Sequence, residues 1–249
     1  MSRTHTDVSL VLSMIAQGLS DHEIARRSGV PRSTVQRWRS ERIPQTDVRA
    51  DWSVSDPSAY GYLLGCYLGD GNILHRPPNG WTLRIACDQR YPDTIDEVLL
   101  TMAQTFPPRQ PTRRARAASA SDVLSISHPG IGCAFPQHGD GPKHRRSISL
   151  MDWQLALTHA HPKPFIRGLI HSDGCRTINR FRTPLPSGRV EEYAYVRYFF
   201  SNLSPDIRAI FREHCELIGI RVTQPNHRNL AVSHRASVAI LDSFIGPKT

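Results

Sequence analysis

Two short segments of this chain share one pattern, an apolar run that ends in Asp-Gly: residues 63–71 (LLGCYLGDG) and 166–174 (IRGLIHSDG). Each segment carries two small residues four positions apart, which are Gly65 and Gly69 in the first and Gly168 and Ser172 in the second. Residues four positions apart lie on one face of a helix, and small side chains there let two backbones approach closely. The segments are therefore predicted to be two helices that pack together on these faces.

Packing of this kind would bring Asp70 and Asp173 side by side, because each acid ends its helix at the same point of the pattern. Two adjacent carboxylates in a basic protein favour a divalent-metal site for phosphodiester chemistry. The net charge of +9 and the isoelectric point near 9.8 favour a polyanionic partner, most often nucleic acid. The alternative is a basic protein without such a partner.

The similarity continues beyond the two Asp-Gly pairs and indicates an internal repeat. Residues 124–128 (LSISH) match residues 230–234 (LAVSH), and Gly-Pro-Lys occurs at both 141–143 and 246–248. The interval from the acid to the lysine is 73 residues in one copy and 75 in the other. Such self-similarity predicts two copies of one supersecondary unit.

Lysine is rare in this chain, and both repeats place one at the same point. Lys143, Lys163 and Lys248 are its only lysines, against 28 arginines. A Lys ammonium differs from a guanidinium fork, because it is a compact point charge able to reach a phosphate or activate a water. Lys143 and Lys248 are therefore predicted to be functional. The alternative is a chance residue after a Gly-Pro turn.

The remaining composition sets limits on the class of protein. The five cysteines are dispersed and form no C-x-x-C pair, so we expect free thiols in a reducing compartment and no zinc site of that type. No apolar run reaches 18 residues and no signal-peptide pattern occurs, so we expect a cytoplasmic protein, nucleoid-associated if bacterial, with no membrane partner. The twelve histidines show no metal-ligand spacing.

Residues 1–42 predict a separate helix-turn-helix domain, followed by a linker at 43–56. Ala25, Gly29, Val30, Val35 and Trp38 have the spacing of that motif, in which Ala permits a close helix crossing and Gly a tight turn. The third helix carries side chains suited to phosphates and base edges: Arg32, Ser33, Thr34, Gln36, Arg37 and Arg39. The stretch resembles the helix-turn-helix of invertases, resolvases and transposases. A helical hairpin with a solvated Arg face is the alternative.

The two Asp-Gly segments resemble the signature motifs of LAGLIDADG homing endonucleases, and the resemblance covers roughly residues 57–249. It implies an α+β fold of tandem αββαββα repeats, at 57–155 and 156–249, related by a pseudo-twofold axis. The signature helices would form the interface between the repeats, and each antiparallel sheet would form a saddle over the major groove of double-stranded DNA. Two repeats in one chain would let a monomer engage a non-palindromic site.

The resemblance also implies roles for the acids and the lysines. Asp70 and Asp173 match the family's metal-binding acids, which hold Mg²⁺ against the two scissile phosphates. Lys143 and Lys248 stand at positions that resemble the family's basic active-site residues. His171 departs from the motif, where the family has an Asp, and we expect it to form a hydrogen bond at the interface between the helices.

Arginines in or beside the predicted strands give a candidate DNA surface, each against the alternative of a solvated position: Arg84, Arg114, Arg116, Arg176, Arg180, Arg182 and Arg197. The strand at 176–180 has Arg, Ile and Arg on one face, which leaves its orientation open. The leading hypothesis is a site-specific endonuclease that makes metal-dependent double-strand breaks. The alternative is a non-cleaving transcriptional regulator with a helix-turn-helix and a LAGLIDADG-like domain. An RNA-binding intron maturase is a third, weaker reading.

Overall fold

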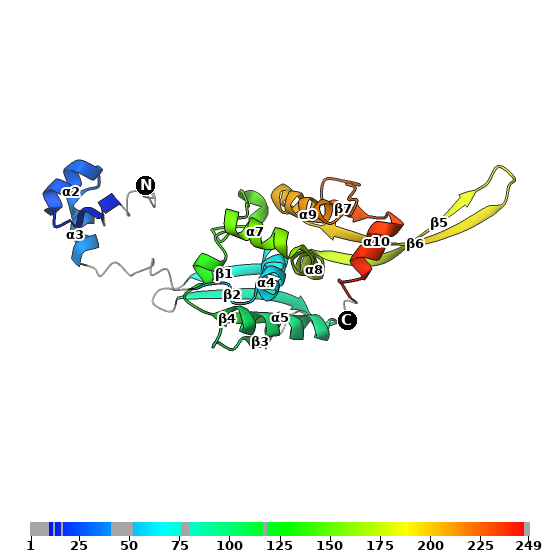
Figure 1. The fold of residues 1–249 in the computed structure, drawn as a ribbon, viewed down its shortest axis with the longest axis horizontal. Helices are drawn as coiled ribbons and strands as arrows, with labels where there is room; N and C mark the ends of the chain where they lie inside the picture. The colour runs from blue at the N-terminus through cyan, green and yellow to red at the C-terminus, as the bar shows by residue number, and fades with distance from the viewer. Residues whose placement is uncertain are drawn as a thin grey trace. The chain divides into compact units, whose positions relative to one another are not determined.

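The computed structural model describes residues 10–11, 13–15, 17–40, 52–75, 80–116 and 119–246 (Figure 1). The chain divides into two units, residues 1–51 and 52–249, and each is described by itself. Lys248 and the side chain of Arg37 lie outside the described parts, so their predicted roles stay predictions. No helix within the described ranges is long and apolar enough to cross a membrane.

The first unit is all-helical in its described part. After a helical stretch at 10–11 and 13–15 come α2 (Asp21–Ser28) and α3 (Arg32–Ser40). The hydroxyl of Ser20 caps α2 by accepting from the Glu23 amide, and Gly29 ends it with a φ of 68°, in the left-handed region. A small core forms from Val11, Ile24, Val30 and Val35, with Trp38 packed against it. The predicted helix-turn-helix arrangement is present.

The second unit begins with one αββαββα repeat. Its elements are α4 (Pro57–Asp70), β1 (Gly71–His75), β2 (Trp81–Asp88), α5 (Pro92–Thr105), β3 (Thr112–Ala115), β4 (Ser121–Ser127) and the short α6 (Ile131–Ala134). Asp56 starts α4 by accepting from the amides of Ser58 and Ala59. The four strands form an antiparallel sheet in the order β1-β2-β4-β3, and α5 packs on one of its faces. The 3₁₀ turn η1 (Lys143–Arg145) and α7 (Asp152–Ala160) lead to the second repeat.

The second repeat has the same order with one strand reduced. It consists of α8 (Pro162–Asp173), β5 (Gly174–Pro184), β6 (Val190–Ser201), α9 (Pro205–Leu217), β7 (Asn229–Val232) and α10 (Arg235–Asp242). Its sheet has the order β5-β6-β7, and a single bridge from Thr223 to Ala231 stands where the first repeat has β3. The predicted α+β fold of tandem repeats is thus confirmed, with this local difference. The β5–β6 hairpin projects beyond the helices of the unit (Figure 1).

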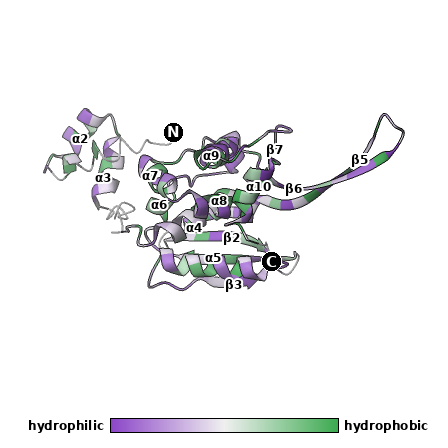
Figure 2. Cartoon of the chain, turned by 45° about the vertical axis from the view of Figure 1, so that its right-hand side comes forward, coloured by the Kyte–Doolittle hydropathy of each residue, from purple (hydrophilic) through white to green (hydrophobic). Residues whose placement is uncertain are grey.

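Two predicted boundaries differ from the structure. Trp52, placed in the predicted linker, donates from its indole N–H to the carbonyl oxygen of Thr105 and packs on Tyr60 and Phe106. The second unit therefore starts before residue 57. The predicted division at 155/156 falls inside α7, because that helix belongs to the connection between the repeats. Figure 2 shows that hydrophobic and hydrophilic residues alternate along α5 and α9, as expected for helices that pack one face against a sheet.

Helices α4 and α8 pack against each other at their glycines. A Cβ atom on Gly65 would lie 2.5 Å from the Phe165 carbonyl oxygen, and one on Gly168 would overlap the Tyr62 carbonyl oxygen. Gly65 faces Phe165 and Leu169 of α8. Gly168 faces Tyr62 and Cys66 of α4, and the two residues of each pair are four positions apart. Such reciprocal contacts are the mark of a twofold relation between the repeats. Ser172 continues the same line, since its side chain faces Gly69.

Candidate functional site

Asp70 and Asp173 end α4 and α8, at the same end of the packed helix pair. The glycine after each acid is required because the chain turns at once into a strand that passes close to the last helical turn. A Cβ atom on Gly71 would lie 2.5 Å from the Cα of Tyr67, and one on Gly174 would lie 2.8 Å from the Cα of Ile170. The Asp-Gly sequence therefore places each acid at the junction of its signature helix with the first strand of its sheet.

Lys143 joins this junction from the Gly-Pro-Lys turn of the first repeat. Its ammonium donates hydrogen bonds to the carbonyl oxygens of Tyr67, Gly69 and Gly71, the last two at 2.9 and 2.8 Å. These carbonyls belong to the last turn of α4 and its exit, where a helix has unpaired oxygens and the negative end of its dipole. The half-buried lysine thus caps the helix that carries Asp70.

Both acids act on this one ammonium. Burial lowers the pKa of Lys143 to about 8, while the carboxylates of Asp173 and Asp70 oppose the shift by stabilising its charge. The contribution from Asp173 is the larger of the two, although Asp173 belongs to the other repeat. Lys143 and the two acids therefore form one electrostatic cluster at the end of the helix pair.

Asp173 has a partner that the sequence did not indicate. Asn202 donates from its amide nitrogen to Oδ2 of Asp173 at 2.5 Å. Asn202 is itself held in place, because its Oδ1 accepts from the Ser204 amide and its carbonyl oxygen accepts from the Arg208 guanidinium. It follows β6 directly and belongs to no recognisable motif, so only its position just before the cap of α9 could have drawn attention to it.

The two acids open onto different hollows. Asp70 lines a cavity of about 480 Å³ together with Cys66, Cys87, Asp88 and Arg90. Asp173 lines a cavity of about 390 Å³ whose wall includes Lys143, His144, Asn202 and Arg228. Each acid therefore has room beside it for a ligand, and the Lys143 ammonium lies at the wall of the second hollow.

The donor set at this site suits a hard divalent cation. Mg²⁺ prefers carboxylate and water oxygens and is typically held by one or two carboxylates. Asp70 and Asp173 offer such oxygens, whereas the carbonyl oxygens of Gly69 and Gly71 are taken by Lys143. Asp70 and Asp173 are therefore the residues that would hold Mg²⁺ at this end of the helix pair.

In the first sheet, strand alternation separates the predicted DNA-contacting arginines from the core. Leu83 and Ile85 are buried on the helix-covered face, so Arg84 between them lies on the open face. Arg114 lies on the same open face, since its neighbour Arg113 pairs in register with the buried Leu124. Arg116 is exposed just beyond β3.

In the second sheet, the predicted arginines lie on two opposite faces. Because the adjacent Tyr198 is buried, Arg197 lies on the opposite, open face. Its guanidinium is 4.3 Å from the ring centre of Phe199. Arg176 pairs in register with Tyr198 and forms an ion pair with Asp242 of α10, at 2.8 Å, on the helix-covered face. The remaining two predicted arginines, Arg180 and Arg182, lie on the same face of the hairpin as Arg176. The orientation left open by the sequence is thereby decided.

In the first unit, the predicted recognition residues fall into two groups. Arg32, Ser33 and Gln36 are exposed on α3, and Thr34 is half-buried. Arg39 instead donates from Nε to Asp21 at 2.6 Å and from its terminal nitrogen to the carbonyl oxygen of Leu19 at 2.5 Å. Arg39 therefore braces α3 against the start of α2.

His171 is buried between the repeats. Its Nε2 lies 3.1 Å from the carbonyl oxygen of Ile245, which can only accept, so Nε2 carries the proton. Nδ1 lies 2.9 Å from the hydroxyl of Tyr62 on α4, so the two side chains form a hydrogen bond between the helices. The expectation of an interface hydrogen bond is confirmed.

Comparison with known proteins gives a match for each part of the chain. Residues 6–42 match the family described as a homeodomain-like domain. No curated protein sequence matches the chain. The structure is similar to that of the LAGLIDADG homing endonuclease I-LtrWI bound to target DNA, with 9% identity over 76% of this chain and 84% of the other and a TM-score of 0.47.

Two further solved structures are similar at the same level. The LAGLIDADG meganuclease I-AabMI, bound to uncleaved DNA, is 10% identical over 74% of this chain and 82% of its own, with a TM-score of 0.48. The homing endonuclease I-WcaI, bound to its DNA recognition sequence, is 10% identical over 84% and 88%, with a TM-score of 0.47. The solved structures similar to this chain are thus LAGLIDADG homing endonucleases, at about 10% identity, and the matched homeodomain-like domain precedes the repeats in the sequence.

Proposed function

We propose that this chain is a site-specific endonuclease that cuts both strands of double-stranded DNA in a divalent-metal-dependent reaction. One observation carries the proposal: Asp70 and Asp173 end two reciprocally packed helices and act on one half-buried ammonium, that of Lys143. Packing of two helices does not require two acids and a half-buried lysine at one end, because desolvating even part of a charge costs stability. Such a constellation suits a ligand that carries both a cation and a phosphate.

In this proposal Asp70 and Asp173 would hold Mg²⁺, and the chemistry such an ion would supply is activation of a water and stabilisation of the leaving oxygen of the phosphodiester. Asn202 fixes the direction of the Asp173 carboxylate by donating to Oδ2. Lys143 supplies positive charge beside the scissile phosphate, held in place by the carbonyl oxygens of the α4 end. Lys248 is proposed for the corresponding role in the second repeat.

DNA would bind along the open faces of the two sheets. Arg84 and Arg114 on the first sheet and Arg197 on the second lie on the faces opposite the buried residues of their strands. The exposed side chains of α3 would add contacts outside the cleavage site. Because the β5–β6 hairpin is longer than the described β1 and β2 strands, the two repeats would read unequal half-sites, and one chain would bind a non-palindromic target as a monomer.

The test is cleavage of a random-sequence library of duplex DNA with Mg²⁺. The unaltered chain is expected to cut a defined sequence, and Asp70→Asn and Asp173→Asn are expected to bind the same sequence without cutting it. Asp96→Asn, which changes an exposed acid on α5, serves as the matched control and should cut normally. Sequence-specific binding by the unaltered chain without cutting under any divalent cation would refute the proposal and favour a transcriptional regulator.

A further inference from the structure

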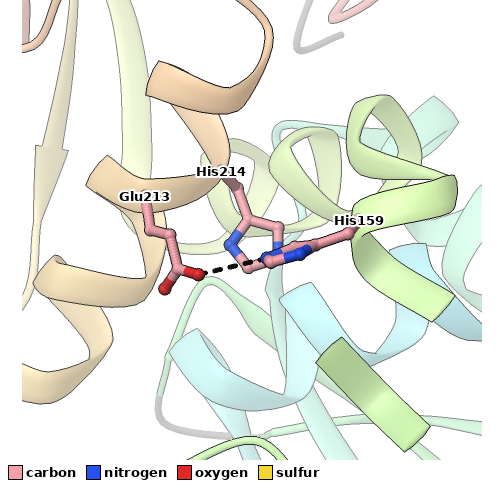
Figure 3. A group of neighbouring side chains, drawn as sticks. All are labelled: His159, Glu213 and His214. Atoms are coloured by element: carbon pink, nitrogen blue, oxygen red, sulfur yellow. Dashed lines mark hydrogen bonds and ion pairs between the residues drawn. The ribbon is translucent and has the colours of Figure 1, made fainter. Parts of the chain in front are cut away.

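A second group of metal-ligating side chains lies between α7 and α9. It consists of His159 on α7 and of Glu213 and His214 on α9 (Figure 3). One ligand atom from each residue lies within 4.8 Å of the other two, and His159 Nε2 is 3.1 Å from Oε1 of Glu213. His159 and Glu213 are 54 positions apart in the chain, so their spacing in the sequence does not indicate a metal site.

Hydrogen bonds fix which nitrogen of His214 is available. Its Nδ1 lies 2.8 Å from the carbonyl oxygen of Ile210, and because a carbonyl only accepts, Nδ1 carries the proton. Nε2 therefore presents a lone pair, which accepts from the hydroxyl of Thr158 at 2.8 Å. Histidines that bind metals usually donate their other N–H to a carbonyl or carboxylate in this way.

The hydroxyl of Thr158 does not block this nitrogen permanently. Thr158 Oγ1 lies 3.3 Å from the carbonyl oxygen of Leu155, which can accept its proton instead. A cation on Nε2 of His214 would therefore leave no donor of Thr158 unpaired, which matters because Thr158 and His214 are both fully buried.

The donor set and its exposure favour one class of cation. Two imidazoles and one carboxylate are a recurrent set for Zn²⁺ with a fourth, open position, whereas Mg²⁺ and Ca²⁺ prefer oxygen ligands alone. The side chains of His159 and Glu213 are 38% and 53% exposed, so a hydrated ion can approach from solvent and keep a water. His214 forms the buried floor of the group.

We infer that His159, Glu213 and His214 form a zinc site that joins α7 to α9. This site is separate from the acidic pair. The ring of His214 contacts that of Phe165 at 4.6 Å between centres, and Phe165 precedes Asp173 by eight positions on α8, about 12 Å along a helix. An ion there would link α7, the last element of the connection between the repeats, to α9 of the second repeat.

The test is calorimetric titration of Zn²⁺ into the metal-stripped, untagged full chain carrying Asp70→Asn and Asp173→Asn, which removes the other proposed cation site. One saturable Zn²⁺ per chain is expected, with no Mg²⁺ binding. His159→Gln and Glu213→Gln should each weaken the affinity more than about tenfold, the lower end of losses seen when even the outer partners of a ligand are removed.

His161→Gln and Glu216→Gln are matched controls, because they change an exposed histidine and an exposed glutamate beside the same helices. Both should bind Zn²⁺ as the parent does, and circular dichroism should show all four variants folded. Absence of saturable Zn²⁺ binding, or equal binding by the His159→Gln, Glu213→Gln double variant, would overturn the inference and leave a metal-free His–Glu contact. Neither result bears on DNA cleavage, which is measured separately with the acids intact.

Discussion

The ammonium of Lys143 donates a hydrogen bond to the carbonyl oxygen of Gly69, 74 positions earlier, next to the acid that ends α4. The same nitrogen also donates to the carbonyl oxygen of Tyr67, three positions before that acid, and to that of Gly71, directly after it. The lysine of the Gly-Pro-Lys turn and the acid of the Asp-Gly turn, which the sequence repeats as separate signals, thus meet in one site.

Lys143→Met is expected to abolish cleavage with only a small change in stability in metal-free buffer. Because burial holds the folded-state pKa near 8, below the usual value of 10.5, the folded state disfavours the charged lysine. Removing the disfavoured charge stabilises the Met variant, whereas loss of the three hydrogen bonds to the end of α4 destabilises it, so the free energy of unfolding at pH 7 should change by no more than about 1–2 kcal/mol. Urea denaturation measures it.

The pH dependence gives this prediction its sign. Between pH 8 and 10.5 the unfolded chain holds a proton on Lys143 that the folded chain has lost, so the stability of the unaltered protein should rise with pH relative to Lys143→Met. Below pH 8 the difference between the two should be constant. A Met variant that is several kcal/mol less stable at pH 7 would make Lys143 a structural residue.

Gly65→Ala should disrupt the packing of the two signature helices. Its Cβ would lie 2.5 Å from the Phe165 carbonyl oxygen, and backbone cannot move aside as a flexible side chain can. We expect a loss of at least about 1–3 kcal/mol in the free energy of unfolding. Gly61→Ala is the control on the same helix, because its Cβ would meet nothing closer than 3.8 Å and Ala favours helix by up to about 1 kcal/mol. Equal effects of the two changes would contradict the close approach of α4 and α8.

Asn202→Ala tests a positioning role toward Asp173. Without the amide donor the carboxylate loses its fixed direction, so we expect cleavage to fall about 10- to 100-fold and to need more Mg²⁺ for half-maximal rate. Asn202→Asp should be worse, since a second carboxylate would repel the first. A rate loss that no Mg²⁺ concentration reduces, with lower thermal stability, would point to a merely structural Asn202.

Arg84→Ala and Arg197→Ala should weaken DNA binding, whereas Arg176→Ala should act on the fold. Each open-face arginine that contacts a phosphate contributes about one unit to the slope of log affinity against log salt, which its removal should lower. Arg176 is paired with Asp242, and at 45% exposure this ion pair is worth at most about 1 kcal/mol of stability. Filter binding at several salt concentrations separates the two groups. An unchanged salt slope for both Arg84→Ala and Arg197→Ala would exclude them from phosphate contact.

Sequence determined the features that depend on local spacing. Small residues four apart specified which faces of α4 and α8 could meet, and Gly71 and Gly174 marked where each helix must turn into a strand. The repeat of these signals predicted two copies of one supersecondary unit, and the resemblance to LAGLIDADG homing endonucleases implied that each copy is αββαββα. The rarity of lysine likewise singled out Lys143 before its contacts were visible.

The tertiary structure decided everything that depends on which segments meet. Alternation along β5 gave Arg176 and Ile178 a common face but could not say that α10 covers it. Asn202 at Asp173, and Glu213 beside His159, belong to segments far apart in the chain whose approach follows from packing of helices and sheets. Sequence spacing fixes neighbours on one element, since backbone geometry is periodic, whereas contacts between elements are set by how their buried faces fit together.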